Sequence, residues 1–400
     1  MGAHGWWAAR GWLISLITLA MPVAFADTVD LQLGLDAQPL ANPTGGRSRS
    51  GTWMQQLNFR VTAGSGLNQP PQRWREQDHW RTRLELSLFS GADDLNERIG
   101  AAFPLQSVAY PSGLWLTEAS LERQSGTGTI GFKAGVFALN PDFVEAPVLN
   151  AYVHSVLNNT LNLDVTGLPV NPYVAPGLRL TWSPGRSGRW GRWQAGAFWL
   201  DPQDELAGLF GVQTDAPVLR GAAQLLQWSY AGLPGHRQST QPLALPAGPV
   251  PRLLPPPLLQ LGGLLVQDVA RSQSTGALTG TVTLAAPLPI GLDNRVWLGV
   301  NAGQRSSSNP VPLFLSGGWL SQGPVPGRPL DRLAIGFGHS RFEAPGLSGL
   351  RQEGVLELNY SWQLDQRFSL QPVLQWIVNP KGSRRLPPIL ATGVQLQLRF

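Results

Sequence analysis

The sequence lacks cysteine and has few charged residues. None of its 400 residues is Cys, and only 14% are Asp, Glu, Lys or Arg. The absence of Cys excludes disulfide bonds, zinc–thiolate sites and thiol nucleophiles. So low a charge content is unusual for a cytoplasmic enzyme, while the hydrophobic content of 42% argues against intrinsic disorder.

Long hydrophobic runs are also missing beyond the N-terminus. No segment downstream of Asp27 approaches the roughly 18 uninterrupted apolar residues of a transmembrane helix. Before it, Arg10 precedes an apolar run, and Ala24-Phe25-Ala26 resembles an A-x-A cleavage site. We therefore expect residues 1–26 to be a signal peptide that is cleaved on export through the Sec route. A retained membrane anchor is the alternative, but the run is short for a spanning helix.

The mature chain instead shows a period of two residues. Near the C-terminus, Val394, Leu396, Leu398 and Phe400 alternate with small or polar residues, and residues 354–364 repeat the pattern. An α-helix could not separate apolar from polar residues in this way, so the pattern predicts β-strands with one oily and one polar face.

The pattern recurs along the whole mature chain. Gly, Pro, Ser and Asn are frequent between the repeats, as expected for turns and loops. About sixteen strands are predicted, an even number that suits a transmembrane antiparallel β-barrel. The strands are expected at residues 28–36, 52–62, 80–90, 114–123, 129–138, 177–183, 193–200, 222–230, 258–268, 277–286, 294–303, 313–320, 332–341, 354–364, 368–378 and 389–400.

The lengths of the connections favour a barrel over a soluble β-sandwich. If Phe400 ends at the periplasmic rim, the short connections at 124–128 and 365–367 are periplasmic turns. The long connections at 91–113, 139–176 and 201–221 then face outward. A Pro-rich insertion at 233–257 falls on the turn side and breaks this rule; it is either an unusual periplasmic extension or a sign that the strands are miscounted there. We predict one all-β domain over residues 27–400.

Several fragments resemble the OprB family of carbohydrate-selective porins. The similarity is densest at Glu357-Leu358-Asn359-Tyr360 and at residues 368–380, which resemble the penultimate strand of the family and its Asn-Pro turn. Residues 42–46 resemble its N-terminal loop, and the chain ends in Phe400. The Pro-rich insertion and the short linker at 268–277 depart from the family. The resemblance implies a sixteen-stranded channel for passive diffusion of sugars across the outer membrane of a Gram-negative-type bacterium.

Side chains on the polar strand faces are the candidates for the pore lining. Both signs of charge occur among them, and they can hydrogen-bond sugar hydroxyls or pair with one another to stiffen the wall. The candidates are Arg60, Arg81, Arg83, Glu85, Glu118, Glu122, Lys133, Arg179, Gln194, Asn301, Glu357, Gln375 and Gln397.

The connection at 139–176 is too long to be a simple link. Its polar and aromatic side chains suit a constriction folded into the lumen, with hydroxyl-binding groups and an aromatic face for a sugar ring. A cap folded outward is the alternative. The candidates for the constriction are Asn140, Asp142, Glu145, Tyr152, His154, Asn162 and Asp164.

Catalysis is not expected. The histidines of the mature chain, His79, His154, His236 and His339, show no spacing typical of a metal site, and no nucleotide-binding motif is present. We predict no cofactor, no metal and no nucleic-acid partner, because the basic residues form no cluster in the sequence. Arg-rich rims would instead contact outer-membrane lipid and lipopolysaccharide or bias the pore against cations.

The sequence thus favours a porin for small carbohydrates. A general or anion-preferring porin is the alternative with the same fold, and a structural envelope barrel with a plugged lumen is the alternative of another class. In addition, barrels of this kind can associate into a homo-oligomer.

Overall fold

The computed structural model describes most of residues 28–400. The described residues are 28–65, 79–125, 129–158, 161–163, 165, 167–185, 190–200, 221–246, 248–268, 272–306, 308–344 and 351–400. The predicted signal peptide, the candidate Asp164 and most of the connection at 201–221 lie outside them. Among the described residues, no helix is both long and apolar enough to cross a membrane.

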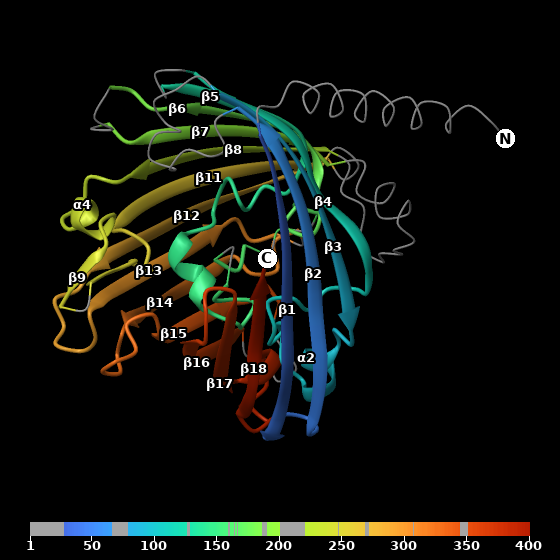
Figure 1. Ribbon diagram of the computed structural model, residues 1–400. Helices are drawn as coiled ribbons and strands as arrows, with labels where there is room; N and C mark the ends of the chain where they lie inside the picture. Colours follow the sequence, from blue (N-terminus) through green and yellow to red (C-terminus); the bar gives the residue numbers. More distant parts are fainter. Residues whose placement is uncertain are drawn as a thin grey trace.

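Sixteen antiparallel strands close into a barrel (Figure 1), which confirms the predicted fold class. Each predicted strand corresponds to an observed one; the largest difference is at the first, which continues well past residue 36. The barrel strands are β1 (Thr28–Thr44), β2 (Ser50–Gly64), β3 (His79–Gly91), β4 (Gly113–Gln124), β5 (Ile130–Phe137), β6 (Ala175–Trp182), β7 (Arg192–Trp199), β8 (Gly221–Tyr230), β11 (Leu258–Asp268), β12 (Gln273–Ala285), β13 (Asp293–Gly303), β14 (Leu313–Gln322), β15 (Arg332–Arg341), β16 (Gln352–Gln363), β17 (Phe368–Val378) and β18 (Ile389–Arg399).

Short elements occupy some connections. They are α2 (Leu95–Ile99), η2 (Pro147–Ala151), α4 (His236–Ser239), η3 (Pro380–Gly382) and the hairpin of β9 (Leu243–Leu245) and β10 (Gly248–Val250).

The first and last strands close the barrel. Leu35 pairs with Leu398, and the backbone N–H groups of Leu33 and Phe400 each donate to the other residue's carbonyl, at 3.0 and 2.8 Å. Closure is what a strand-built protein needs in a bilayer, because hydrocarbon offers no partner for a free backbone N–H or C=O group.

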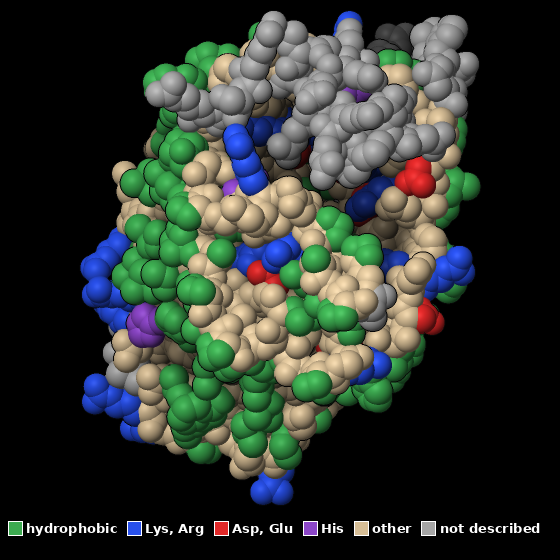
Figure 2. Space-filling view, turned by 60° about the vertical axis from the view of Figure 1, so that its left-hand side comes forward, with side chains coloured by type: hydrophobic (Ala, Val, Ile, Leu, Met, Phe, Trp, Pro, Cys, Tyr) green, Lys and Arg blue, Asp and Glu red, His purple; other side chains and the backbone are tan. Residues whose placement is uncertain are grey.

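The two faces of the strands follow the predicted alternation. On β13, Leu298 is 61% exposed on the outer face, whereas Trp297 and Asn301 on the inner face are 2% and 0% exposed. Figure 2 shows hydrophobic side chains gathered along the outer wall at the left of the view. The inner face is buried because segments of the chain fill much of the lumen.

Long and short connections sort largely to opposite ends. We call the end at which Phe400 lies the Phe400 rim, and the opposite end the loop rim. The long connections at 92–112, 138–174 and 200–220 join strands at the loop rim. The connection at 231–257 is the long exception at the Phe400 rim, as strand parity predicts. Because β8 and β11 pair directly, this connection is an extension and the strands are not miscounted.

Candidate pore and its constriction

The 138–174 loop folds into the barrel because its side chains are apolar. Val148, Leu149, Val153 and Leu157 are at most 1% exposed and join a hydrophobic core with inward residues of the strands. Burial of this kind contributes roughly 1.5–3 kcal/mol per large aliphatic side chain. The inward fold matches the predicted constriction rather than the outward cap.

One aromatic residue fixes the loop against the wall. The Tyr152 hydroxyl accepts a hydrogen bond from Trp297 Nε1 at 2.8 Å and donates to the carbonyl of Ile335 at 3.1 Å. A Cβ atom on Gly336 would lie 2.4 Å from the Tyr152 ring, and one on Gly318 would lie 2.5 Å from its hydroxyl. Glycine at these two positions therefore makes room for Tyr152.

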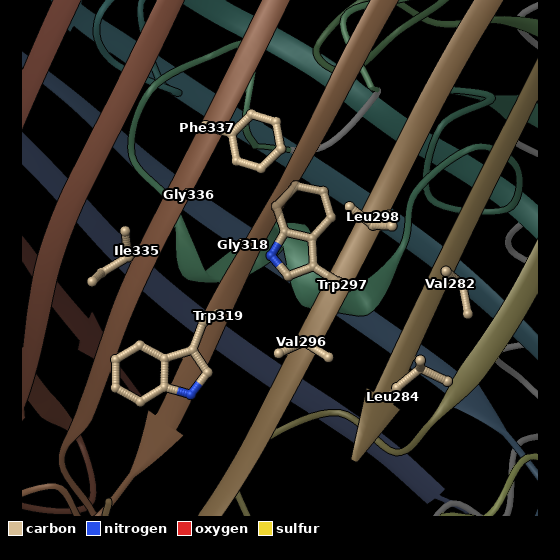
Figure 3. A pocket seen from close by; sticks show the side chains of 10 residues that line it. All are labelled: Val282, Leu284, Val296, Trp297, Leu298, Gly318, Trp319, Ile335, Gly336 and Phe337. Atoms are coloured by element: carbon tan, nitrogen blue, oxygen red, sulfur yellow. The ribbon is translucent and has the colours of Figure 1, made fainter. Parts of the chain in front are cut away.

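Figure 3 shows the same part of the wall, with the Trp297 indole reaching toward Gly318 and with Gly336 on the next strand. Outward side chains such as Leu298, Ile335 and Phe337 surround an apolar depression there of about 460 Å³. This depression belongs to the outer wall, so it is not part of the passage.

A buried carboxylate on β16 also holds the loop. Glu357 is 0% exposed, and its oxygens accept hydrogen bonds from the backbone N–H groups of Val153 and His154 at 2.8 and 2.7 Å. The amides of Asn359 and Gln375 donate to the same carboxylate at 2.7 and 3.1 Å. These four donors compensate the buried charge without a counter-cation.

The 92–112 loop is fixed in a similar way. Glu353, on the same strand, accepts from the backbone N–H groups of Ala102 at 2.9 Å and Lys381 at 2.6 Å. Gln375 donates to the carbonyl of Leu105 at 2.9 Å. One strand, β16, thus positions both inward-folded loops.

Opposite charges line the inner face of β2 to β6 and form a ladder of ion pairs. The pairs link neighbouring strands, so most of the charge is compensated within the wall. The contacts are Arg60–Glu85 at 2.5 Å, Arg81–Glu122 at 2.5 Å, Arg83–Glu118 at 3.2 Å, Lys133–Glu118 at 2.8 Å and Arg179–Glu122 at 2.7 Å.

The loop contributes one member of this ladder. Asp142 accepts from Lys133 Nζ at 2.9 Å and from Arg179. Its backbone carbonyl accepts from Gln194 Nε2 at 3.0 Å. The loop is therefore held on one side by the ladder and on the other by Glu357.

A polar cavity of about 280 Å³ remains beside the loop. It lies between the two inward-folded loops and the inner faces of β1, β2, β3 and β18. Side-chain amides dominate its lining. The lining residues are Asp36, Gln38, Gln56, Phe89, Ser107, Val108, Tyr110, Asn140, Glu145, Asn150, Asn158, Asn171, Gln395, Gln397 and Arg399.

The amides of the strands are oriented by hydrogen bonds. Gln38 Nε2 donates to Gln395 Oε1 at 2.6 Å and to Ser107 Oγ at 2.9 Å. Gln397 donates to Asp36 at 2.9 Å, and Arg399 binds both oxygens of Asp36 at 2.7 and 2.9 Å. These contacts fix the amide dipoles and neutralise Asp36 within the cavity wall.

Glu145 carries the other negative charge of the cavity. It accepts a hydrogen bond from Asn150 Nδ2 at 3.1 Å, an amide rather than a cation. Burial raises the pKa of Glu145 above its usual range; the Asn150 bond opposes this shift, and nearby Asp142 adds to it.

An aromatic corner closes the cavity toward the 92–112 loop. The rings of Phe89 and Tyr110 pack edge to face with their centroids 5.3 Å apart, and the rings of Tyr110 and Tyr173 do so with centroids 6.4 Å apart. Ring faces at a polar cavity can pack against the C–H surface of a sugar.

All residues predicted for the pore lining lie on the inner face. Gln397 lines the cavity; the charged residues from Arg60 to Arg179 form the ladder. The others face the two inward-folded loops. Glu357, Gln194 and Gln375 make the contacts given above, Gln375 with the 92–112 loop, and Asn301 Nδ2 donates to the carbonyl of Asn162 at 3.3 Å. The structure thus separates the candidates into a cavity group and an anchoring group.

The candidates from the 138–174 loop also fall into groups with different positions. Asn140 and Glu145 line the cavity, and Asp142 joins the ladder. The expectation that Tyr152 offers its ring to a sugar must be corrected, because Tyr152 is 1% exposed against the wall.

His154 and Asn162 likewise do not line the cavity. His154 is 1% exposed, and burial lowers its pKa to about 3. Asn162 donates to Ser340 Oγ at 2.9 Å behind the loop.

Sequence reasoning missed several cavity residues. Gln38 lies beyond the predicted end of the first strand, which hid its inward position. Gln56 and Gln395 have the correct strand parity and could have been found by it, whereas no sequence signal indicates that Asn150, Asn171 or Tyr110 reach the cavity. The missed lining residues are Asp36, Gln38, Gln56, Phe89, Ser107, Val108, Tyr110, Asn150, Asn171, Gln395 and Arg399.

Solved structures with the same fold include two of OprB from Pseudomonas putida. The high-pH structure has a TM-score of 0.74 at 15% identity, covering 93% of this chain and 94% of that one. The low-pH structure has a TM-score of 0.50 at 14% identity, covering 100% and 97%. OmpT of Vibrio cholerae, an outer membrane protein with loop L8 deleted, has a TM-score of 0.52 at 9% identity, covering 93% and 99%. At these identities the likeness shows the fold.

Comparison of the sequence itself finds similarity to one family over part of the chain. No curated protein matches the chain. Residues 265–400, which contain β12 to β18 and the Glu353 and Glu357 anchors, match the model of a family described as carbohydrate-selective porin, OprB family. This match covers about a third of the chain, so the C-terminal part of the closed sixteen-stranded barrel is similar to the OprB family of carbohydrate-selective porins.

Proposed function

We propose that small neutral sugars diffuse passively through this barrel by way of the amide-lined cavity. The chain is a porin and not an enzyme, so no bond of the solute changes. The observation that carries the proposal is the cavity lining, which offers amides from both the wall and the 138–174 loop. An amide supplies donors and an acceptor in one group, which matches a sugar hydroxyl, itself both donor and acceptor.

The charge distribution supports neutral solutes over ions. The ladder compensates most of its charges through shared ion pairs, and Arg399 neutralises Asp36. Strong single-sign fields, which attract ions of the opposite sign, are therefore not expected at the cavity.

A general or anion-preferring porin remains the second candidate. The side chains of Arg60, Arg81 and Arg83 stay 35%, 23% and 23% exposed despite their ion pairs. Their guanidinium groups can meet an anion that enters from the Phe400 rim. The plugged envelope barrel is the third candidate, since the 138–174 loop fills much of the lumen.

Single-channel recording in a planar bilayer separates these candidates. A monosaccharide should interrupt the ion current briefly and in proportion to its concentration, and a disaccharide should do so differently. Loss of one hydrogen-bonding amide is worth roughly 0.5–1.5 kcal/mol, so Gln395→Leu should weaken the sugar block about 2- to 12-fold. Gln224→Leu is the matched control, because Gln224 lies on the exposed outer face of β8.

The outcomes of that recording are distinct. A sugar block that falls in Gln395→Leu and not in Gln224→Leu supports the proposal. Ion current with no response to sugar supports the general porin. An absence of current supports the plugged barrel.

Lipid partners are proposed from the loop rim. Arg305, Arg341 and Arg351 are exposed there, at or beside the ends of β13, β15 and β16. Guanidinium groups bind phosphate in a bidentate manner, which suits the phosphates of lipopolysaccharide. Replacing the three by Gln should reduce the lipopolysaccharide that co-purifies with the barrel.

We also propose that the chain reaches the outer membrane by the Sec route with loss of residues 1–26. N-terminal sequencing of the mature protein should then begin at Asp27. Cross-linking in native membranes would show whether barrels associate.

A further inference from the structure

The Pro-rich connection at 231–257 turns back under the barrel instead of extending away from it. It carries α4 and the β9–β10 hairpin, and residue 247 is its one position outside the described part. In Figure 1, α4 and β9 lie just beyond the ends of β8 and β11 to β13. Proline fixes φ and has no N–H, so such a segment is stiff and offers carbonyl acceptors.

Arg295 binds the segment from the wall. This inward residue of β13 is 0% exposed, and it donates to the carbonyl of Pro255 at 2.6 Å and to Ser239 Oγ at 2.8 Å. Asp293 pairs with Arg295 at 2.6 Å and with Arg252 of the segment at 2.8 Å. The segment is thus held by a buried charge network as well as by backbone acceptors.

Gln322, at the end of β14, provides a second attachment. It is 0% exposed, donates to the carbonyl of Pro251 at 2.9 Å and accepts from the backbone N–H of Leu253 at 2.8 Å. The next residue, Leu254, is 3% exposed and belongs to the same hydrophobic core as Leu320 and the 138–174 loop.

The inner wall near this segment is buried. Near the Phe400 rim, Thr283 on β12 and Ala334 on β15 are 3% and 2% exposed. Across the barrel, Asp36, Gln397 and Arg399 line the open cavity at the same rim.

We propose that residues 231–257 form a fixed floor that closes the Phe400 rim beneath β11 to β15. Solutes then leave only along the wall of β18, β1 and β2. The floor, together with the 138–174 loop, sets the width of the exit and hence the size of solute that passes. This inference rests on the proposed passage of solutes through the cavity.

The natural absence of Cys makes a labelling test possible. Thr283→Cys places a near-isosteric thiol on the buried inner face of β12, near the end of the strand that the floor approaches at Ala285, and Gln397→Cys places one in the open cavity. In reconstituted barrels, a small charged methanethiosulfonate should modify Gln397→Cys at least 10-fold faster than Thr283→Cys, and only the former should lose conductance.

Releasing the floor should expose the covered thiol. Adding Arg295→Ala to Thr283→Cys should raise its labelling rate at least 10-fold and increase the conductance of the unlabelled channel. Arg237→Ala, an exposed Arg of the same segment, should leave Thr283→Cys protected. If Arg295→Ala fails to assemble, Gln322→Ala removes the second attachment in its place.

Labelling of Thr283→Cys at the rate of Gln397→Cys, or continued protection after the attachments are removed, would overturn the proposal. Neither of these labelling results depends on whether a sugar blocks the ion current, which is measured separately. Failure of the floor is therefore distinguishable from failure of the proposed transport function.

Discussion

At the scale of single residues, the lumen is a place where most charges have a partner. Asp36 is bound by Arg399, and the carboxylates of the ladder are bound by arginines and by Lys133. Glu145 differs, because its partner is the amide of Asn150. A lone partly buried charge beside the passage should influence which ions cross.

Glu145→Gln should therefore shift the ion selectivity toward anions. A partly screened unit charge is worth roughly 0.5–1 kcal/mol at such a distance, or about 2- to 5-fold in the permeability ratio. Because burial raises the pKa of Glu145, the carboxyl becomes neutral as the pH falls through that raised value. The reversal potentials of variant and wild type in a salt gradient should differ at high pH and converge at low pH; equal potentials at high pH would contradict this assignment.

Glu357→Ala tests the carboxylate that holds the 138–174 loop. The variant leaves the N–H groups of Val153 and His154 buried without an acceptor, which should lower the free energy of unfolding by about 3 kcal/mol. Denaturant unfolding followed by Trp fluorescence measures the change. The control, Glu97→Ala on the exposed face of α2, should stay within about 0.5 kcal/mol. Equal changes in the free energy of unfolding for the two variants would show that Glu357 does not hold the 138–174 loop.

The direction in which each strand residue faces could be predicted from the sequence, because alternation alone determines it. The predicted lumenal residues do face inward. Whether such a residue meets water or protein depends on the path of the 138–174 loop, which has no periodicity to reveal it. For this reason Glu357 and Gln397 look alike in the sequence, yet one is a buried anchor and the other lines the cavity.

At the scale of elements, the 138–174 loop determines the shape of the lumen. It is attached on one side to the charge ladder and on the other to β16, and its apolar residues fill the space between. Each attachment can be tested separately.

Asp142→Asn tests the attachment to the ladder. Lys133 and Arg179 keep Glu118 and Glu122 as partners, so the cost should be about 2 kcal/mol, below the usual loss for a buried ion pair. The exposed pair of Asp94 and Arg98 offers a control, since Asp94→Asn should cost at most about 0.5 kcal/mol. Unfolding measurements that give the same small change for both would show that Asp142 does not hold the loop.

Gly336→Ala tests the fit of Tyr152 against the wall. The added methyl group would overlap the Tyr152 ring, so the loop must shift at a cost of about 1–3 kcal/mol. We expect altered single-channel conductance together with lower stability. At Gly276, the nearest atom to an added Cβ is the Leu264 carbonyl oxygen at 3.6 Å, so Gly276→Ala should behave like wild type. Normal conductance and stability in Gly336→Ala would contradict the packing described here.

The positions of the strands could be predicted from the sequence, whereas the paths of the connections could not. Strand existence follows from the period-two pattern, even for 222–230 and 258–268. The extension of β1 to Thr44 was missed because Pro39 and Pro43 interrupt the pattern, although β1 pairs with β2 as far as Asn42. The folding of residues 231–257 under the barrel depends on contacts with Arg295 and Gln322, which are distant in the sequence.

At the scale of the whole molecule, a closed sheet separates lipid from water. Its outer face carries exposed Leu, Val and Trp side chains, and its inner face carries amides and paired charges. The match of residues 265–400 to the porin family model and the closed barrel support the proposed porin function, and the cavity through which we propose that solutes cross lies on one side of the lumen, along β18 and β1 to β3.

Liposome swelling measures the central claim most directly, because it requires both insertion into lipid and a water-filled path for sugar. Vesicles containing the purified mature protein should swell in an isosmotic monosaccharide at a rate proportional to the protein content, and more slowly in a disaccharide. Protein-containing vesicles that swell no faster than empty ones in either sugar would contradict the account.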